Sequence, residues 1–259
     1  MNIFIRELKA NRKALIIWSI CMVLGVMSGM AKYTAYSSSG ASSQIFDKLP
    51  YSLKALLGMG SFEVTKMSGF FAMLFLYIEL TVAIHAVLLG NGIIAKEEQD
   101  KTTEFLMVKP VPRTAIITAK LLAALFNIVI INLVTLVSSI LMVGAYNRGK
   151  DITGEIMMFF LSLFIVQLIF LSLGALVSSF IKKPKASGSV ATGIMFGSFI
   201  IAKITDLTDR VNLINVFSPF KYFSYADIVN GKGLSPSAAV LSIILIALFF
   251  GFTYFFYTK

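Results

Sequence analysis

Six apolar runs, each long enough to cross a lipid bilayer, limit what this chain can fold into. A bilayer core of about 30 Å needs about 20 apolar residues in a helix. We place the runs at Ala14–Met30, Gly69–Ala95, Ala115–Gly144, Glu155–Ile181, Ala186–Ala202 and Pro236–Thr258. The composition agrees, since 57% of the residues are hydrophobic and only 14% are charged. We therefore expect an all-α polytopic membrane protein whose residues 1–259 form a single transmembrane domain without a soluble domain.

Residues 2–13, which precede the first run, have an amphipathic pattern. On a helix, one side would carry Phe4, Ile5 and Leu8, and the other Arg6, Lys9 and Lys13. This pattern favours an N-terminal interfacial helix. A basic start followed by an apolar run is also compatible with a secretory signal.

The distribution of Lys and Arg predicts the orientation. Six spans place both termini on one side, and the loops on that side hold more of the 23 Lys and Arg in a shorter length of chain. Because cytoplasmic loops carry the excess of these residues, we expect cytoplasmic termini. The net charge of +10 is explained by this bias, and the positive charge would attract anionic membrane lipid. Because the charge has this explanation, we expect no nucleic-acid partner.

The loop between the second and third runs is the most distinctive segment. Lys96–Arg113 reads KEEQDKTTEFLMVKPVPR, and its acidic residues are Glu97, Glu98, Asp100 and Glu104. Glu97 and Lys101 have the i,i+4 spacing that supports a helix. Pro110 and then Pro112 end that helix before the next run begins. The segment therefore predicts a short polar helix, a sharp turn and a new membrane helix.

This hairpin resembles that of the ABC-2 type permeases, the membrane subunits of prokaryotic ABC exporters. The residues that carry the resemblance are Thr102, Glu104, Pro110, Val111 and Arg113. The basic N-terminal helix, the six spans and a Ser-Pro-Phe stretch before the last span extend it over essentially the whole chain. The chain departs from many relatives at Lys101, where they have Gly, and at Pro112, where they have Ser or Thr, and these changes concern the details of the turn.

The resemblance implies that this chain forms an export pathway and is not an enzyme. A separate cytoplasmic ATPase, expected in two copies, would bind ATP and Mg, and this chain would hold no catalytic residue and no cofactor of its own. The hairpin would be a cytoplasmic coupling helix, with the ATPase-coupling residues Glu97, Glu98, Thr102, Glu104, Pro110 and Arg113. A second permease chain, identical or related, would complete a dimer.

Polar side chains inside the spans are candidates for the translocation pathway. A charge at mid-bilayer costs about 2.5 to 3.5 kcal/mol and calls for a partner or a wet cavity. Glu79 and His85 lie six residues apart in the second span, which rotates them about 120° around a helix, so each needs a partner elsewhere. Either residue lines the pathway or makes a structural hydrogen bond between helices. Asn127, Asn132 and Gln167 are expected to be helix-packing groups.

Small residues recur every four positions in two of the spans. Gly25 and Gly29 do so in the first span, and Ser189, Gly193 and Gly197 in the fifth. Such spacing lets neighbouring helix backbones approach closely, so we assign these residues to helix packing.

Two segments outside the spans have apolar character. A Leu-rich stretch at Leu53, Leu56 and Leu57 is suited to the membrane surface. An aromatic cluster before the last span is suited to the membrane interface and consists of Phe217, Phe220, Tyr222, Phe223 and Tyr225.

Two patterns imitate ligand sites. Gly144–Asp151 matches GxxxxGK but ends in Asp where a phosphate-binding loop has Ser or Thr, and no strand precedes it. Asp206 and Asp209 lie beside Arg210, as in a solvated turn, and no His or Cys cluster completes a metal site. We predict no metal.

Two functions other than the permease stay open from the sequence: an ATP-independent channel or transporter, and a membrane scaffold or immunity protein that does not transport.

Overall fold

The computed structural model describes residues 3–38, 50–58, 62–99, 111–147, 149, 151–181, 183–208 and 214–258. Within these ranges the chain forms helices and no strand. The helices are α1 (Ile3–Met30), α2 (Tyr33–Ser38), α4 (Tyr51–Leu56), α5 (Met67–Gln99), α7 (Arg113–Tyr146), α8 (Thr153–Phe180), α9 (Pro184–Leu207), the 3-10 helix η2 (Pro219–Lys221), α10 (Tyr225–Val229) and α11 (Pro236–Thr258).

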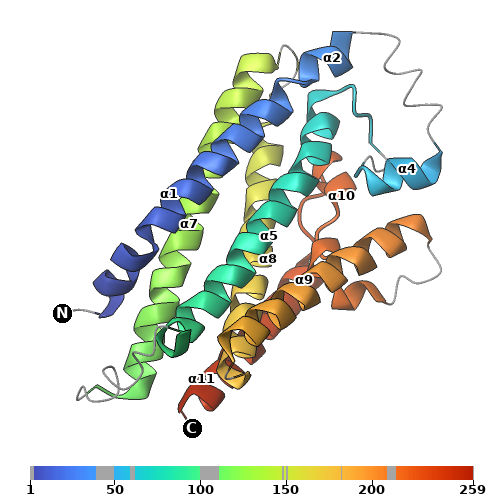
Figure 1. Cartoon of the computed structure of the whole chain (residues 1–259). Helices are drawn as coiled ribbons and strands as arrows, with labels where there is room; N and C mark the ends of the chain where they lie inside the picture. Colours follow the sequence, from blue (N-terminus) through green and yellow to red (C-terminus); the bar gives the residue numbers. More distant parts are fainter. Residues whose placement is uncertain are drawn as a thin grey trace.

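Six of the helices in the described part of the chain are long and apolar enough to cross a membrane, which confirms the expected fold class. They are α1, α5, α7, α8, α9 and α11. In Figure 1 both chain termini, the end of α5 and the start of α7 lie at the same end of the bundle, whereas α4 and α10 lie away from it. The sixth span has the predicted bounds, Pro236–Thr258.

The first span differs most from its predicted bounds. The segment expected to be a separate interfacial helix is the beginning of α1, which runs without a break from Ile3 to Met30. Phe4 and Leu8 pack against the core, while Lys9 is exposed. Ile5, assigned to the apolar side, is 47% exposed and Glu7 is buried, so the amphipathic character of this segment and its place at a membrane surface stay predictions.

The packing of α5 against α8 forms the centre of the molecule. At Gly90 a Cβ atom would collide with the main-chain carbonyl of Leu171, and at Gly174 it would collide with that of Val87. Both positions therefore require glycine, because only a residue without a side chain lets the two backbones come so close. Buried aromatic rings continue this contact toward the α10 side, where Phe75 and Phe159 have centroids 4.7 Å apart.

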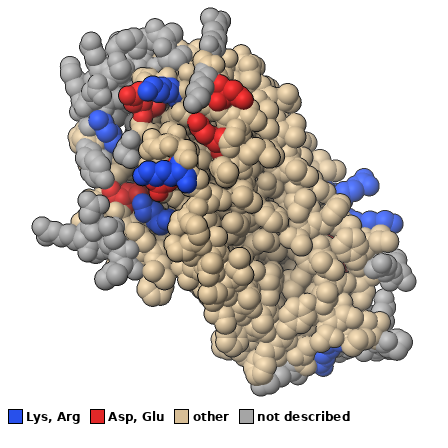
Figure 2. All heavy atoms as spheres, turned by 180° about the vertical axis from the view of Figure 1, so that it is seen from behind, with Lys and Arg blue, Asp and Glu red and all other residues tan. Residues whose placement is uncertain are grey.

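The outer helices keep large apolar faces on the surface. Ile17 on α1, Leu141 on α7 and Ile243 on α11 are each more than 60% exposed. Seen from behind in Figure 2, charged side chains gather at the upper left and at the lower and right edges, with a broad uncharged area between them. An exposed apolar surface of this kind suits contact with lipid.

The predicted aromatic cluster faces inward more than expected. Phe220, Tyr222 and Phe223 are buried, and only Phe217 is strongly exposed, at 73%. Phe220 packs edge-on against Phe199 of α9 at 5.4 Å. On its other side Phe220 packs against Phe170 of α8 at 5.0 Å. Most of the cluster therefore packs within the protein, and its place at a membrane interface stays a prediction.

Candidate functional site

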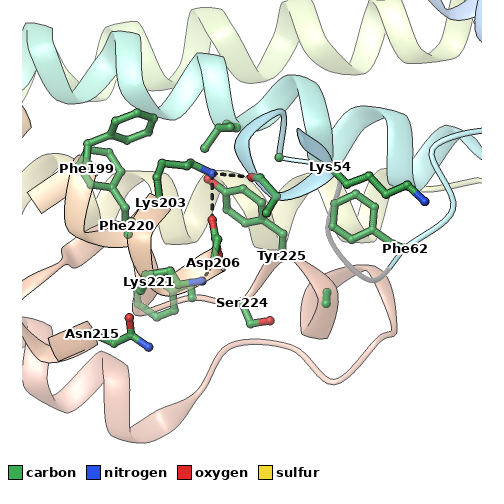
Figure 3. Close-up of a pocket in the computed structure, with 16 residues that line it drawn as sticks. Lys54, Phe62, Phe199, Lys203, Asp206, Asn215, Phe220, Lys221, Ser224 and Tyr225 are labelled. Atoms are coloured by element: carbon green, nitrogen blue, oxygen red, sulfur yellow. Dashed lines mark hydrogen bonds and ion pairs between the residues drawn. The ribbon is translucent and has the colours of Figure 1, made fainter. Parts of the chain in front are cut away.

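A pocket of about 420 Å³ opens between α4, α5, α9 and the segment from Asn215 to Ala226. Figure 3 shows that side chains from these distant segments converge on it. Phe62, Phe199 and Phe220 supply aromatic surface. The charged side chains that line it are Lys54, Lys203, Lys221 and Asp206.

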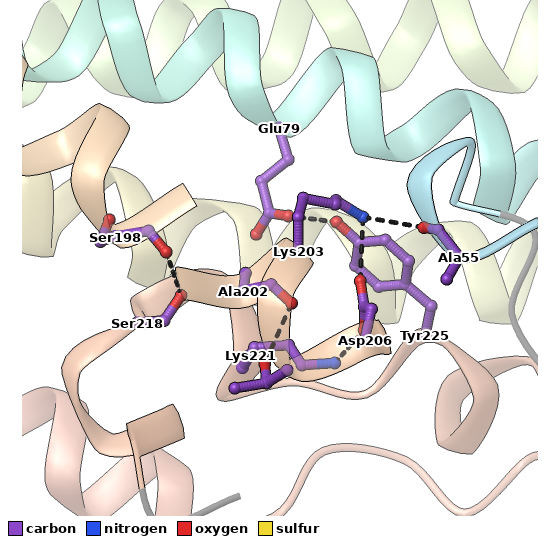
Figure 4. A network of polar contacts seen from close by, with 10 residues as sticks. Ala55, Glu79, Ser198, Ala202, Lys203, Asp206, Ser218, Lys221 and Tyr225 are labelled. Atoms are coloured by element: carbon purple, nitrogen blue, oxygen red, sulfur yellow. Dashed lines mark hydrogen bonds and ion pairs between the residues drawn. The ribbon is translucent and has the colours of Figure 1, made fainter. Parts of the chain in front are cut away.

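An ion-pair network holds the wall of the pocket together. Lys203 lies in the last turns of α9, and its Nζ donates to Asp206 Oδ2 at 3.0 Å. Lys221 Nζ donates to the other carboxylate oxygen of Asp206. Lys203 Nζ also approaches the carbonyl of Ala55 at 3.5 Å, which ties α4 to α9, as Figure 4 shows. The expectation that Asp206 belongs to a solvated turn is wrong, since it is a half-buried member of α9 with two lysine partners.

Glu79 lies immediately behind this network, on α5. It is 3% exposed and accepts a hydrogen bond from the hydroxyl of Tyr225 on α10. The Tyr225 ring stands edge-on to Phe75 and to Phe159, at 5.6 and 5.7 Å. These contacts fix α10 against α5 and α8, so Glu79 has a structural partner on another element.

His85 points in a different direction from Glu79. It is 5% exposed and packs edge-on against Trp18 of α1, with the ring centroids 5.1 Å apart. Its Nδ1 has no hydrogen-bond partner among the described residues. Glu79 and His85 are therefore not brought together, as their spacing predicts, and a role for either in a pathway stays a prediction.

Only part of the predicted coupling hairpin falls within the described residues. Thr102, Glu104 and Pro110 lie outside them. Glu97 and Glu98 belong to the end of α5, which continues through Gln99 without a break. The start of the coupling helix predicted near Lys96 is therefore not separate from the second span, because Lys, Glu and Gln all favour helix and no breaker intervenes.

Arg113 begins α7, as the hairpin requires, and reaches the last turn of α11. Its Nη1 donates to the carbonyl of Thr258 at 3.4 Å. One turn further along α7, the hydroxyls of Thr118 and Tyr254 are 2.8 Å apart. A cation at a helix C-terminus is favourable, since it satisfies a carbonyl that the helix leaves unpaired. The sequence gives no signal for this pairing, because the two residues are far apart in the chain.

Lys120 is a buried residue of α7 rather than a loop cation. It is fully buried, and its Nζ donates to the carbonyl of Ile93 on α5 at 2.8 Å. Its bond joins α5 to α7 close to the hairpin.

The small residues assigned to helix packing behave differently from one another. A Cβ atom at Gly29 would meet the side chain of Leu74 on α5. At Gly25, Gly193 and Gly197 it would meet nothing within 4 Å, and Ser189 is exposed. Within the described part of this chain, these four residues do not make close helix contacts, because they lie on outer surfaces of α1 and α9.

The predicted polar packing groups also divide into two kinds. Asn132 of α7 donates to Gln167 of α8 at 2.9 Å, a bond between helices as expected. Asn127 donates instead to the carbonyl of Ala123 in its own helix, at 2.7 Å. The expectation of an interhelical role is therefore wrong for Asn127, whose amide returns to the preceding turn.

The phosphate-loop imitation has a local structural explanation. Asp151 precedes α8 and accepts hydrogen bonds from the hydroxyl and the backbone N–H of Thr153, at 2.6 and 3.0 Å. These bonds lower the pKa of Asp151 below its ordinary value. The Asp151 carboxylate therefore accepts hydrogen bonds at the start of α8, where a negative charge is favourable because it lies at a helix N-terminus. The described residues include no group of three metal-ligating side chains.

The lysines of the pocket are the site residues that the sequence prediction missed. The fifth span was predicted to end at Ala202, which placed Lys203 in a loop, whereas α9 continues to Leu207. A basic residue next to the end of an apolar run was the available signal, since such residues extend along the helix toward its polar end.

Comparison with known families supports the resemblance seen in the sequence. The family model described as ABC-2 family transporter protein matches residues 1–259. A comparison with individual curated proteins gave no match.

Proposed function

Because the chain belongs to the ABC-2 transporter family, we propose that it is the membrane subunit of an ABC exporter driven by a separate cytoplasmic ATPase. The observation that carries the proposal is the family match over residues 1–259. The six apolar helices agree with it, since a chain with this architecture is a multi-pass membrane protein.

The cytoplasmic end of the proposed permease is the end that holds both termini. The Lys and Arg distribution supports this orientation. In Figure 1 the end of α5 and the start of α7 lie at the same end of the bundle as the termini. The segment Lys96–Arg113 would then meet the ATPase, and ATP and Mg would be bound by that partner.

The acidic residues Glu97, Glu98 and Glu104 are proposed as contacts for basic groups on the ATPase. Two bonds would spread a displacement of this segment into the membrane helices. Lys120 joins α7 to α5 through Ile93, and Arg113 joins α7 to the end of α11. The start of α7 would therefore move together with both neighbours.

A second permease chain, identical or related, is part of the proposal. Gly25 on α1 and Gly193 and Gly197 on α9 have open space beside them. These surfaces would allow a close approach by helices of another chain. We place Glu79 near the export pathway, since it adjoins the pocket, whereas His85 faces α1.

The proposal is tested by isolating the tagged chain from native membranes in mild detergent and identifying its partners by mass spectrometry. We expect a stoichiometric ABC-type ATPase with the wild type and its loss with Glu104→Arg. The matched control is Glu63→Arg, which makes the same charge change at an exposed residue preceding α5. A chain that comes out without an ATPase in several detergents would refute the proposal and favour an ATP-independent function.

A further inference from the structure

The outward side of α1 carries three cations in one group. Lys9, Arg12 and Lys13 are all exposed. They have the i,i+3 and i,i+4 spacing that places side chains next to one another on a helix. Their directions differ by at most about 100° around the helix axis. Three positive groups with this spacing can therefore contact one anion from the same side of the helix.

No acidic side chain of α1 neutralises this group. Glu7 is the only acidic residue of the helix, and it is 2% exposed and pairs with Arg6 at 3.0 Å. It lies about 160° around the helix from Lys9, on the side that faces the protein. Among the described residues, no hydrogen bond or ion pair joins Lys9, Arg12 or Lys13 to another side chain. The three cations are therefore available to a negatively charged molecule outside the bundle.

An apolar surface continues this group along the same side of α1. Ile16, Ile20 and Met27 lie within about 20° of the direction of Lys9, and they are 48%, 54% and 44% exposed. The helix rises about 16 Å from Ile16 to Met27, which is close to half of a bilayer core of about 30 Å. We call the three cations and these three apolar residues the outer stripe of α1. Its apolar part has the length of the hydrocarbon region of one lipid leaflet.

The other sides of α1 are used differently. Met22 and Val26 are buried in the protein, and Trp18 packs against α5. Gly25, whose open side would admit a second permease chain, lies about 160° around the helix from Lys9. A molecule bound on the outer stripe would therefore not compete with that chain.

We propose that the outer stripe of α1 binds an anionic phospholipid, with Lys9, Arg12 and Lys13 on its headgroup and Ile16 and Ile20 along an acyl chain. An arginine donates two parallel bonds to a phosphate and a lysine contacts it as a point charge, so the group suits a phosphate with several acceptor oxygens. Neither the family match nor the proposed export function assigns such a site. Net charge alone draws anionic lipid to any basic loop, whereas a bound lipid requires these cations at these positions.

The test uses the full chain in neutral detergent micelles, with dioleoylphosphatidylglycerol as the probe. Dioleoylphosphatidylcholine has the same acyl chains and a phosphate but no net charge, so it is the matched lipid. Native mass spectrometry measures how much of each lipid the chain retains. Acetylation of lysines, read by peptide mass spectrometry, measures protection of Lys9 and Lys13, with Lys185 as an exposed lysine outside the stripe. A further arm replaces the lipid with inorganic phosphate at constant ionic strength.

The matched variant exchanges neighbouring residues and so keeps both composition and net charge. Lys9→Ala with Ala10→Lys, and Lys13→Ala with Ala14→Lys, turn both ammonium groups by about 100° around α1. Ala10 and Ala14 are exposed, so the exchange places no charge inside the protein. We expect the wild type to retain phosphatidylglycerol in preference to phosphatidylcholine, and the exchanged variant to bind phosphatidylglycerol at least about fivefold more weakly.

Protection of Lys9 and Lys13 is measured in the wild type and so does not depend on whether the variant folds. Protection by phosphatidylglycerol but not by phosphatidylcholine, with Lys185 unprotected, would support the site. Equal retention by the wild type and the exchanged variant would show attraction by net charge alone and would overturn the proposal. Absence of protection by phosphatidylglycerol, or equal protection by inorganic phosphate, would overturn it as well, because no lipid would then be bound along the stripe.

Discussion

The crossing of α5 and α8 offers the sharpest stability test. In Gly174→Ala the new methyl group meets two backbone atoms of the facing turn of α5, the carbonyl oxygen of Val87 and, at 2.9 Å, the nitrogen of Asn91. Neither atom belongs to a side chain that can rotate away. Either α5 and α8 separate along their contact, which is the most extensive one among the described helices, or the backbone distorts to accommodate the methyl group.

The size of this effect follows from the cost of overpacking. Inserting a methylene into a close-packed core costs about 1–3 kcal/mol. For a chain of this size, about 1 kcal/mol corresponds to a fall of about 2–4 °C in the unfolding midpoint. We expect Gly174→Ala, and likewise Gly90→Ala at the facing position, to lower the midpoint by several degrees. The double variant should lose less than the sum, because the first substitution already separates the helices.

The assay heats the purified chain in one detergent and measures, at each temperature, the fraction of protein that remains monodisperse. The temperature at which half of it is lost is the unfolding midpoint. The control is Gly251→Ala on α11, where an added Cβ meets no atom within 4 Å. Alanine favours helix over glycine by about 1 kcal/mol, so the control should be unchanged or slightly more stable. If Gly174→Ala is as stable as Gly251→Ala, the inferred close approach of α5 and α8 is refuted.

Three further predictions follow from particular contacts. Tyr225→Phe leaves the buried Glu79 without its hydroxyl partner and should cost about 1–3 kcal/mol in unfolding free energy, most of it recovered when Glu79→Leu is added; no recovery would contradict the pairing. Asn132→Leu removes the bond to Gln167, and a double-mutant cycle with Gln167→Leu should give a coupling energy of only about 0.6 kcal/mol, the average for such bonds in membrane proteins; a coupling energy of several kcal/mol would contradict this. Hydrogen bonds from the hydroxyl and the backbone N–H of Thr153 lower the pKa of Asp151, so their stabilising effect is present above the ordinary pKa and is lost as the pH falls through the lowered one. Thr153→Val removes the hydroxyl and keeps the backbone N–H, so it should raise the pKa of this carboxyl part of the way toward its ordinary value in an NMR titration, and an unchanged titration would contradict the assignment.

The spans could be predicted because each is a local property of the sequence. A run such as Pro236–Thr258 is apolar throughout, and crossing a bilayer requires nothing from the rest of the chain except length. One boundary signal was also local, since Pro112 stands directly before the start of α7. The error at the end of the fifth span has the same origin. Lys203 is charged, so an apolar run ends before it although the helix does not.

The pocket could not be predicted, because its residues share no local pattern. Glu79 and Tyr225 are separated by 146 positions, and Lys203 and Ala55 by 148. Their meeting depends on how α4 and α10 fold back onto α5 and α9. The sequence does indicate that Glu79 needs a partner on another element, since a charge in a span is costly. It does not indicate which of the many polar residues outside the spans supplies it.

The glycines show why a spacing rule predicts a property of a helix but not its partner. Ser189, Gly193 and Gly197 have the regular spacing, yet no helix of the described chain packs closely there, whereas Gly90 and Gly174 are isolated in sequence and touch backbone. A small residue only permits close approach. At Gly90 and Gly174 the approach occurs because each lies opposite a main-chain carbonyl of the other helix. The described helices therefore have a close backbone contact at their centre, between α5 and α8, whereas the small residues of α1 and α9 lie on outer surfaces. In the proposed permease, such surfaces would allow helices of a second chain to approach closely.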